Sequence, residues 1–283
     1  IGDMFDNFVY SDKREPGPAL GEANMSKVYD EAIAYLDAAL PIVQAAPNVD
    51  AELQRRILAL RARAKHGKAV WQKTNPRPVA QPLANPYVNA GADDAAAALA
   101  VGPMAANYRW QIVFAAATTF NEWSFEVNSR RELSVAAAPK DFVETAKDDP
   151  RIVAETADFK NNTKYGGDRY SPFTVVSERE MQLIIAEGHV ASGNNQAAAD
   201  ILNTLRARDA LAPLTDIAQA GALLQHERRA NLFMMGRRLV DMYRFNIKAT
   251  QWQPSSDAIT NPGTLFPITI QERRANPLVA GGG

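Results

Sequence analysis

The amino-acid sequence predicts an all-α fold in which pairs of helices are separated by long irregular loops. Apolar residues recur at helical spacing in two separate blocks, 24–72 and 177–245, as expected for helices that bury one face. A capping-box sequence stands directly before the second block. Between the blocks, prolines and glycines are frequent, and the apolar–polar alternation that marks strands is sparse.

The composition excludes several classes of protein. The chain has 283 residues, of which 46% are hydrophobic and 22% charged, as in globular proteins. Lys and Arg number 31 against 32 Asp and Glu, and this balance argues against broad electrostatic binding of nucleic acid or an anionic membrane. The sequence has no cysteine, which excludes disulfides, thiolate zinc sites and cysteine nucleophiles. No apolar stretch approaches the roughly 18 residues that span a bilayer.

The first block is expected to form an antiparallel helical hairpin from Asn24 to Gln72. Asn24 can cap the first helix, and Pro41 should end or kink it. Asp50 follows a turn and can cap the second helix. The apolar faces are expected to be Tyr29, Ile33, Leu36 and Leu40 in the first helix and Leu53, Ile57, Leu60 and Ala64 in the second.

A second hairpin is expected after Ser177, where Ser177 and Glu180 form the capping box. Gly193-Asn194 separates its two helices, and a third helix is expected over roughly Gly221 to Phe245. The two hairpins share one design and suggest tetratricopeptide-like packing, in which each pair buries its face against a neighbour. We therefore expect one compact domain with three parts: an N-terminal segment and first hairpin over 1–72, a loop-rich, aromatic-containing insertion over 73–176, and a C-terminal helical block and tail over 177–283.

The insertion is expected to be mostly loop because prolines punctuate its first part. Asp93 to Ala100 predicts one short helix, and Lys140 to Pro172 reads as irregular and polar. Five aromatic residues in or beside the insertion are candidate ligand-binding residues, since sugar rings present apolar C–H faces that stack on aromatic rings. They are Trp71, Tyr87, Tyr108, Trp110 and Trp123, and packing in the core is the alternative for each.

No catalytic motif is evident, and no cofactor or metal is expected. The three histidines, His66, His189 and His226, lack metal-ligand spacing. Glu122 and Glu126 lie one helical turn apart, which leaves an all-α glycoside hydrolase as an alternative, although pairing with nearby arginines is the simpler interpretation.

A dense set of charges in the third helix is interpreted as structural. Residues three apart on a helix can form ion pairs, and such a series would order the helix and dock it against the hairpins. The residues assigned to this role are Glu227, Arg228, Arg238, Asp241 and Arg244.

The second half of the sequence also carries an ordered series of short motifs. It begins with the run from Ser177 to Glu187, followed by Ala191 to Asn194 and Ile201 to Arg208. It continues with Leu211 and Pro213, His226 to Arg229, Leu232-Phe233, Gly236 to Arg238, Asp241, Arg244-Phe245, Phe266 to Ile268, Glu272 and Asn276-Pro277. This series resembles the SusD/RagB family, and the hairpin of 24–72 resembles that family's tetratricopeptide portion.

The resemblance implies a non-enzymatic lipoprotein on the outer-membrane surface of Bacteroidota-like bacteria. Such proteins bind glycans or other nutrients and cap a SusC-like, TonB-dependent transporter. The chain begins Ile1-Gly2-Asp3 and lacks the family's lipidated cysteine, so we expect its N-terminal part to be missing and its membrane contact to be only through an anchor outside this chain. Asn231, Met235, Arg237 and Phe245 depart from the residues usual in the family's third helix, and ligand residues vary too widely to be transferred.

Two hypotheses of function follow. The first is a cell-surface glycan- or nutrient-binding subunit of such an uptake system, which binds cargo without turnover. The second is a helical-repeat scaffold that binds protein partners or assembles with itself.

Overall fold

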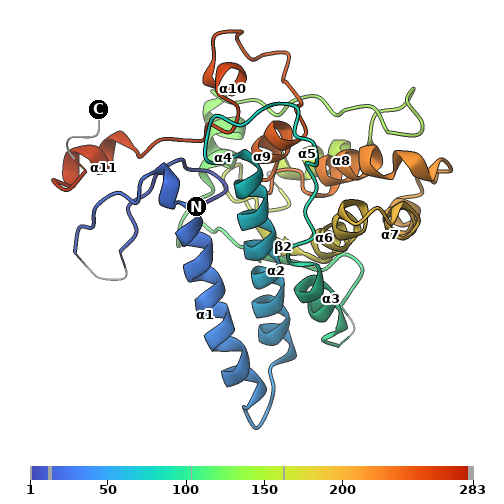
Figure 1. Cartoon of the computed structure of the whole chain (residues 1–283), viewed down its shortest axis with the longest axis horizontal. Coiled ribbons are helices and arrows are strands. Elements are labelled where there is room, and N and C mark those ends of the chain that lie inside the picture. The colour runs from blue at the N-terminus through green and yellow to red at the C-terminus, as the bar shows by residue number, and fades with distance from the viewer. Residues whose placement is uncertain (1, 12–14, 103, 162, 280–283) are drawn as a thin grey trace. The chain divides into compact units, whose positions relative to one another are not determined.

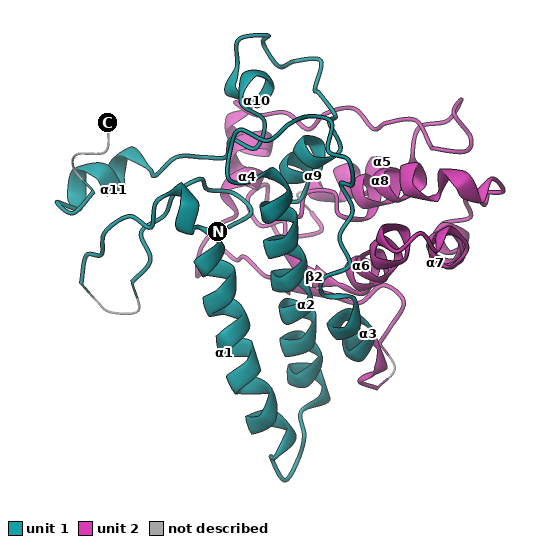
Figure 2. Ribbon diagram, in the orientation of Figure 1, with its two compact units in different colours: residues 1–98, 236–283 teal, residues 99–235 magenta. Residues whose placement is uncertain are grey.

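The computed structural model describes residues 2–11, 15–102, 104–161 and 163–279, which form two compact units (Figure 2). Unit 1 spans 1–98 and 236–283, so its two stretches of chain are distant in sequence. Unit 2 spans 99–235. The division at 72/73 and 176/177 made from the sequence stays a prediction.

Unit 1 contains the predicted hairpin, formed by α1 (Ser26–Gln44) and α2 (Ala51–Thr74), which lie side by side (Figure 1). Asp50 caps α2 as predicted, since its Oδ1 accepts hydrogen bonds from the amides of Glu52 and Leu53, both at 3.0 Å. The predicted cap at Asn24 is wrong, because Asn24 lies in the short helix η1 (Glu22–Asn24) and its side chain donates to the Leu20 carbonyl at 2.9 Å. Pro41 does not end α1, which continues to Gln44.

Arg61 of α2 connects three helices of unit 1. Its guanidinium pairs with Asp37 of α1 at 2.8 Å and with Asp94 of α3 (Ala92–Ala100) at 2.6 Å. Gly91 precedes α3 with a φ of +86°, and a Cβ there would lie 2.3 Å from the carbonyl oxygen of Ala62. Only glycine therefore allows this close approach of α3 to α2.

The remaining helices of unit 1 are α9 (Arg238–Arg244), which packs on α2, α10 (Asp257–Thr260) and α11 (Ile270–Ala275). The first residues of the chain are tied to this unit through Asp3, whose Oδ1 accepts from the Tyr29 hydroxyl at 2.8 Å. Burial opposes ionisation of Asp3, but the charges of Arg237 and Arg63 outweigh it and lower its pKa.

The core of unit 2 is built around α6 (Glu178–Ala191), which packs against α7 (Asn195–Arg208) and α8 (Ala220–Asn231). Ser177 caps α6 as predicted, since its Oγ accepts from the Glu180 amide at 3.1 Å. Fully buried apolar side chains come from all three helices and include Met181, Leu183, Ile184, Leu202, Leu205, Leu223 and Leu224.

Unit 2 also contains elements that the sequence did not predict. Strands β1 (Arg109–Ile112) and β2 (Phe173–Ser177) pair antiparallel, with Arg109 opposite Ser177 and an irregularity between Trp110 and Gln111. Helix α5 (Pro150–Phe159) lies within the region expected to be irregular. The short turns α4 (Glu122–Ser124), η2 (Phe125–Arg130) and η3 (Ile217–Gln219) complete the unit.

The predicted third helix is interrupted. α8 ends at Asn231 and α9 begins at Arg238, and between them Met234 and Gly236 have φ values of 58° and 74°. These left-handed conformations are incompatible with a continuous right-handed helix. The prediction of a mainly helical fold with long loops is confirmed, and the structure adds the two-stranded sheet and helix α5 to it. None of the described helices combines the length and apolarity needed to cross a membrane.

Candidate functional site

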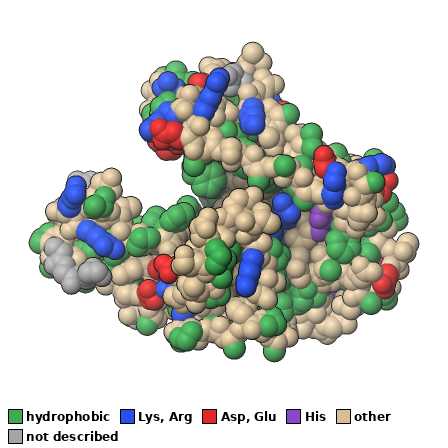
Figure 3. All heavy atoms as spheres, turned by 90° about the horizontal axis from the view of Figure 1, so that it is seen from above, with side chains coloured by type: hydrophobic (Ala, Val, Ile, Leu, Met, Phe, Trp, Pro, Cys, Tyr) green, Lys and Arg blue, Asp and Glu red, His purple; other side chains and the backbone are tan. Residues whose placement is uncertain are grey.

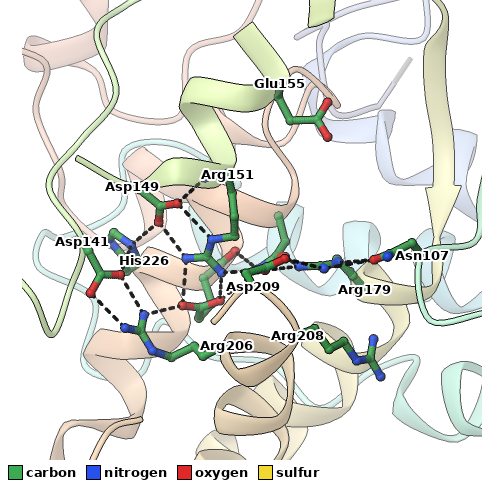
Figure 4. A network of polar contacts seen from close by, with 12 residues as sticks. Asn107, Asp141, Asp149, Arg151, Glu155, Arg179, Arg206, Arg208, Asp209 and His226 are labelled. Carbon is green, nitrogen blue, oxygen red and sulfur yellow. Dashed lines mark hydrogen bonds and ion pairs between the residues drawn. The ribbon is translucent and has the colours of Figure 1, made fainter. Parts of the chain in front are cut away.

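A network of buried charges lies inside unit 2 and includes Asp141, Asp149, Arg151, Arg206 and His226 (Figure 4). Glu227 of α8 joins its two arginines. The Glu227 carboxylate is fully buried and accepts hydrogen bonds from Arg151 at 2.5 and 3.1 Å and from Arg206 at 3.0 Å. The Asn231 amide, one turn further along α8, donates to it at 2.9 Å. We call Glu227, Arg151, Arg206, Asp141, Asp149 and His226 the buried arginine network.

Arg206 of α7 connects Glu227 to Asp141. Its guanidinium is fully buried and donates to both carboxylate oxygens of Asp141, at 3.0 and 2.9 Å, while its Nε donates to the Ala212 carbonyl at 2.7 Å. Burial raises the pKa of Asp141, but Arg206 and two backbone amides outweigh burial and lower it to about 2.

Arg151 connects Glu227 to Asp149, the residue that caps α5. Asp149 accepts from the Arg151 amide, Nε and Nη2 at 3.0, 3.0 and 2.7 Å. His226 Nε2 lies 2.9 Å from Asp149 Oδ2, the oxygen that also accepts from Arg151 Nη2. Burial opposes ionisation of Asp149, yet His226 and Arg151 lower its pKa well below the usual range.

Asp141, Asp149 and His226 have the donor types of a metal site, and their ligating atoms lie within 4.8 Å of one another. Each carboxylate, however, already accepts two guanidinium N–H bonds, from Arg206 or from Arg151. A cation there would add its charge to two buried arginines. The geometry therefore favours an ion-pair network that joins α5, α7 and α8, and we assign no metal to it.

A second group of polar contacts extends from the network (Figure 4). Arg179 of α6 donates to Asp209 at 2.5 and 2.9 Å, to Asn107 at 3.1 and 3.0 Å, and to Asn231 at 2.8 Å. Asn231 therefore contacts both Arg179 and Glu227. Arg208 pairs separately with Glu178 at 2.6 Å.

The five candidate aromatic residues divide between the two units. Trp71 lies at the end of α2 and Tyr87 in the following loop, where its ring is 5.5 Å from that of Phe245, and both are half-buried in unit 1. Tyr108 and Trp110 are half-buried in unit 2, and Trp123 is 40% exposed there. Their role as ligand-binding residues stays a prediction.

Trp123 lies in an exposed aromatic region of unit 2. Its ring meets Phe173 edge-on with centroids 6.3 Å apart, and Phe120 nearby in sequence is also 40% exposed. The Phe120 ring meets Phe125 edge-on at 5.3 Å, and the Arg169 guanidinium lies 4.6 Å from the Phe125 centroid. Glu126 pairs with Arg130 at 2.9 Å, the simpler of the two interpretations of this glutamate.

The residues assigned to structural ion pairs also occupy both units. In unit 2, Arg228 lies 3.4 Å from Glu187, with both side chains buried, and Glu227 is central to the buried arginine network. In unit 1, Arg244 pairs with Asp241 at 2.9 and 2.7 Å and donates to the Pro86 carbonyl, while Arg238 begins α9.

Sequence reasoning did not identify Asp141, Asp149, Arg151 or Arg206. One signal was available for Asp149 and Arg151, because Asp149-Pro150 combines a good capping residue with proline at the first helical position and so marks the start of α5. Nothing local indicated that Asp141 would meet Arg206, because these residues are 65 positions apart.

The fold is that of a SusD-like protein. A solved structure of a SusD-like protein from Bacteroides fragilis NCTC 9343 is similar to this chain with a TM-score of 0.53 and 13% identity, over 87% of this chain and 65% of that one. This chain therefore spans about two thirds of the length of that relative. No curated protein matches the sequence.

The sequence itself identifies the family. The SusD family profile matches residues 114–277, more than half of the chain, and the chain belongs to this family. The predicted membership of the SusD/RagB family is thus confirmed. Proteins of the family are non-catalytic binding proteins.

Proposed function

We propose that this chain is a nutrient-binding subunit at the outer-membrane surface, which captures glycans for a SusC-like, TonB-dependent transporter. Membership of the SusD family over residues 114–277 is the observation that carries this proposal. The balanced surface supports capture of a neutral cargo. The face drawn in Figure 3 carries both Lys or Arg and Asp or Glu side chains, and the formal net charge is −1.

Exposed aromatic rings in unit 2 support a glycan as the cargo. Trp123 and Phe120 are each 40% exposed, and an aromatic ring in contact with water can stack on the apolar face of a sugar. The other four predicted ligand-binding residues, Trp71, Tyr87, Tyr108 and Trp110, are half-buried and expose part of their side chains.

Affinity electrophoresis and calorimetry with a panel of polysaccharides test the proposal. We expect retardation by at least one polysaccharide and its loss in Trp123→Ala. Tyr35→Ala is the matched control, because Tyr35 is an aromatic residue of α1 that is 59% exposed and outside the candidate set. Absence of binding to every glycan, peptide and cofactor tested would contradict the proposal.

Copurification tests the proposed association with a SusC-like transporter. Co-expression with a TonB-dependent transporter encoded beside this protein should give a complex that copurifies from the outer membrane. A regular homopolymer that forms without ligand or transporter would instead favour the helical-repeat scaffold.

A further inference from the structure

Unit 2 contains a cavity that none of the five candidate aromatic residues lines. Its volume is about 570 Å³, within the roughly 300–1,000 Å³ typical of small-molecule sites. β1 contributes Arg109 and Gln111 to its wall, and α5 contributes Ala154 and Glu155. We call this space the unit 2 cavity.

The charged side chains of the cavity wall are paired with one another. Arg109 pairs with Glu155, and Lys164 pairs with Asp158. Burial opposes the charged form of Arg109, but its hydrogen bond with Glu155 outweighs burial and raises its pKa.

Deeper in the wall, Arg179 pairs with Asp209 at 2.5 Å, and Arg151 belongs to the buried arginine network. An ionic ligand would have to displace one of these internal partners and lose its own hydration. A neutral ligand can enter and leave every pair intact.

The wall also offers both hydrogen-bond donors and hydrogen-bond acceptors. Gln111 Nε2 donates to Thr174 Oγ1 at 3.1 Å, which leaves the Gln111 carbonyl as an acceptor and the Thr174 hydroxyl hydrogen as a donor. Asn107 accepts from Arg179 through Oδ1, which leaves its amide as a donor. A hydroxyl group both donates and accepts, so a ligand with several hydroxyls suits this mixed wall.

Apolar groups complete the lining. Phe233, Met234 and Met235, from the turn after α8, face the same space as Tyr165 and Pro172. A sugar ring presents apolar C–H faces as well as hydroxyls, and both parts find partners here. The polar side of the wall is held in place, because Arg179 and Arg151 are fixed by several hydrogen bonds each, and such preorganisation reduces the entropy lost on binding.

We propose that the unit 2 cavity binds one neutral sugar residue, either a free hexose or the end of an oligosaccharide, separately from the exposed aromatic region of Trp123. The inference rests on the proposed function in taking carbohydrate as the cargo. It adds a second site whose specificity is set by fixed ion pairs and hydrogen bonds.

Calorimetry on the full chain tests this site with glucose, galactose and mannose as probes, and with glucuronate, glucosamine and glycylglycine as charged or peptide alternatives. Ala154→Trp fills the cavity from α5, and we expect it to weaken binding of the preferred hexose by at least about tenfold. Ala157→Trp is the matched control, because Ala157 is an exposed alanine of the same helix outside the lining, and it should bind within about twofold of wild type. Gln111→Leu removes hydrogen bonding without added bulk and should also weaken hexose binding.

The outcomes separate this inference from the proposed function. Hexose binding that survives Trp123→Ala and is lost in Ala154→Trp supports the cavity. Polysaccharide binding that Ala154→Trp leaves unchanged, without any hexose binding, or equal loss in Ala154→Trp and Ala157→Trp, overturns the cavity site and leaves the proposed function standing. Preference for glucuronate, glucosamine or glycylglycine overturns the neutral-sugar assignment, and absence of all binding overturns both proposals.

Discussion

Replacement of Arg206 by methionine tests whether the buried arginine network stabilises unit 2. Methionine keeps an unbranched side chain of moderate length but removes every hydrogen-bond donor. Arg206 is fully buried and donates to Asp141, Glu227 and the Ala212 carbonyl. After the substitution Glu227 keeps Arg151 and Asn231, whereas Asp141 loses Arg206 and keeps two backbone amides.

The expected loss of stability follows from these contacts. The pKa of Asp141 falls from 3.8 to about 2 in the folded protein, which corresponds to roughly 2–3 kcal/mol, shared between Arg206 and the amides of Val143 and Glu144. The Ala212 carbonyl loses a hydrogen bond, which costs about 1 kcal/mol or more. We therefore expect Arg206→Met to reduce the free energy of unfolding by about 3–5 kcal/mol at pH 7, as for other broken buried ion pairs.

Urea unfolding followed by far-UV circular dichroism measures this loss, which should fall on the transition of unit 2. Arg130→Met is the control, because Arg130 is an exposed arginine of the same unit whose ion pairs with Glu126 and Glu132 are screened by water and contribute little to stability. A loss in Arg206→Met no larger than that in Arg130→Met would refute the reasoning.

The pH dependence of the free energy of unfolding is a second test of the role of Arg206. The folded pKa of Asp141 lies below its unfolded value, so the stability from this group is fully present above 3.8 and is lost as the pH falls to about 2. The variant lacks the part of this contribution that Arg206 supplies at every pH. The difference between wild type and Arg206→Met should therefore narrow over that range, and a difference that stays constant would contradict the assignment.

Three further substitutions test local features. Gly91→Ala should destabilise unit 1 by about 2 kcal/mol or more in urea unfolding, because φ is +86° and the new Cβ would clash with the Ala62 carbonyl; no loss would contradict the close approach. Asp50→Ala should cost about 1 kcal/mol, and Asp50→Asn, which keeps the capping oxygen, much less. Ser177→Ala should cost about 1 kcal/mol through the lost bond to the Glu180 amide, with Ser177→Asp as the rescuing variant.

The helices could largely be predicted from the sequence because their determinants are local. Asp50 and Ser177 cap helices through amides two or three residues away, and the apolar periodicity that follows each one marks the buried face. The interruption between α8 and α9 was missed, because a left-handed Met234 has no reliable sequence signal. Membership of the SusD family could also be predicted from the sequence, since it depends on the order of motifs along the chain.

The site residues were harder to predict because their exposure and contacts depend on parts of the chain that are distant in sequence. Trp123 was identified from residue type alone, and its exposure became known only from the packing of Phe173 and its neighbours. β1 and β2 are too short to show a strand pattern in the sequence. Each is stabilised by a partner strand about 60 residues away, which no local pattern indicates.

The sequence by itself determined a mainly helical chain of the SusD family with local caps and a balanced charge. Only the tertiary structure decided which charges are buried together and where a cavity remains. The pairing of Arg206 with Asp141 and of Arg151 with Glu227 joins segments 65 and 76 residues apart. Such contacts depend on how whole helices pack, and the free energy that selects them is shared across unit 2 and carried by no local pattern.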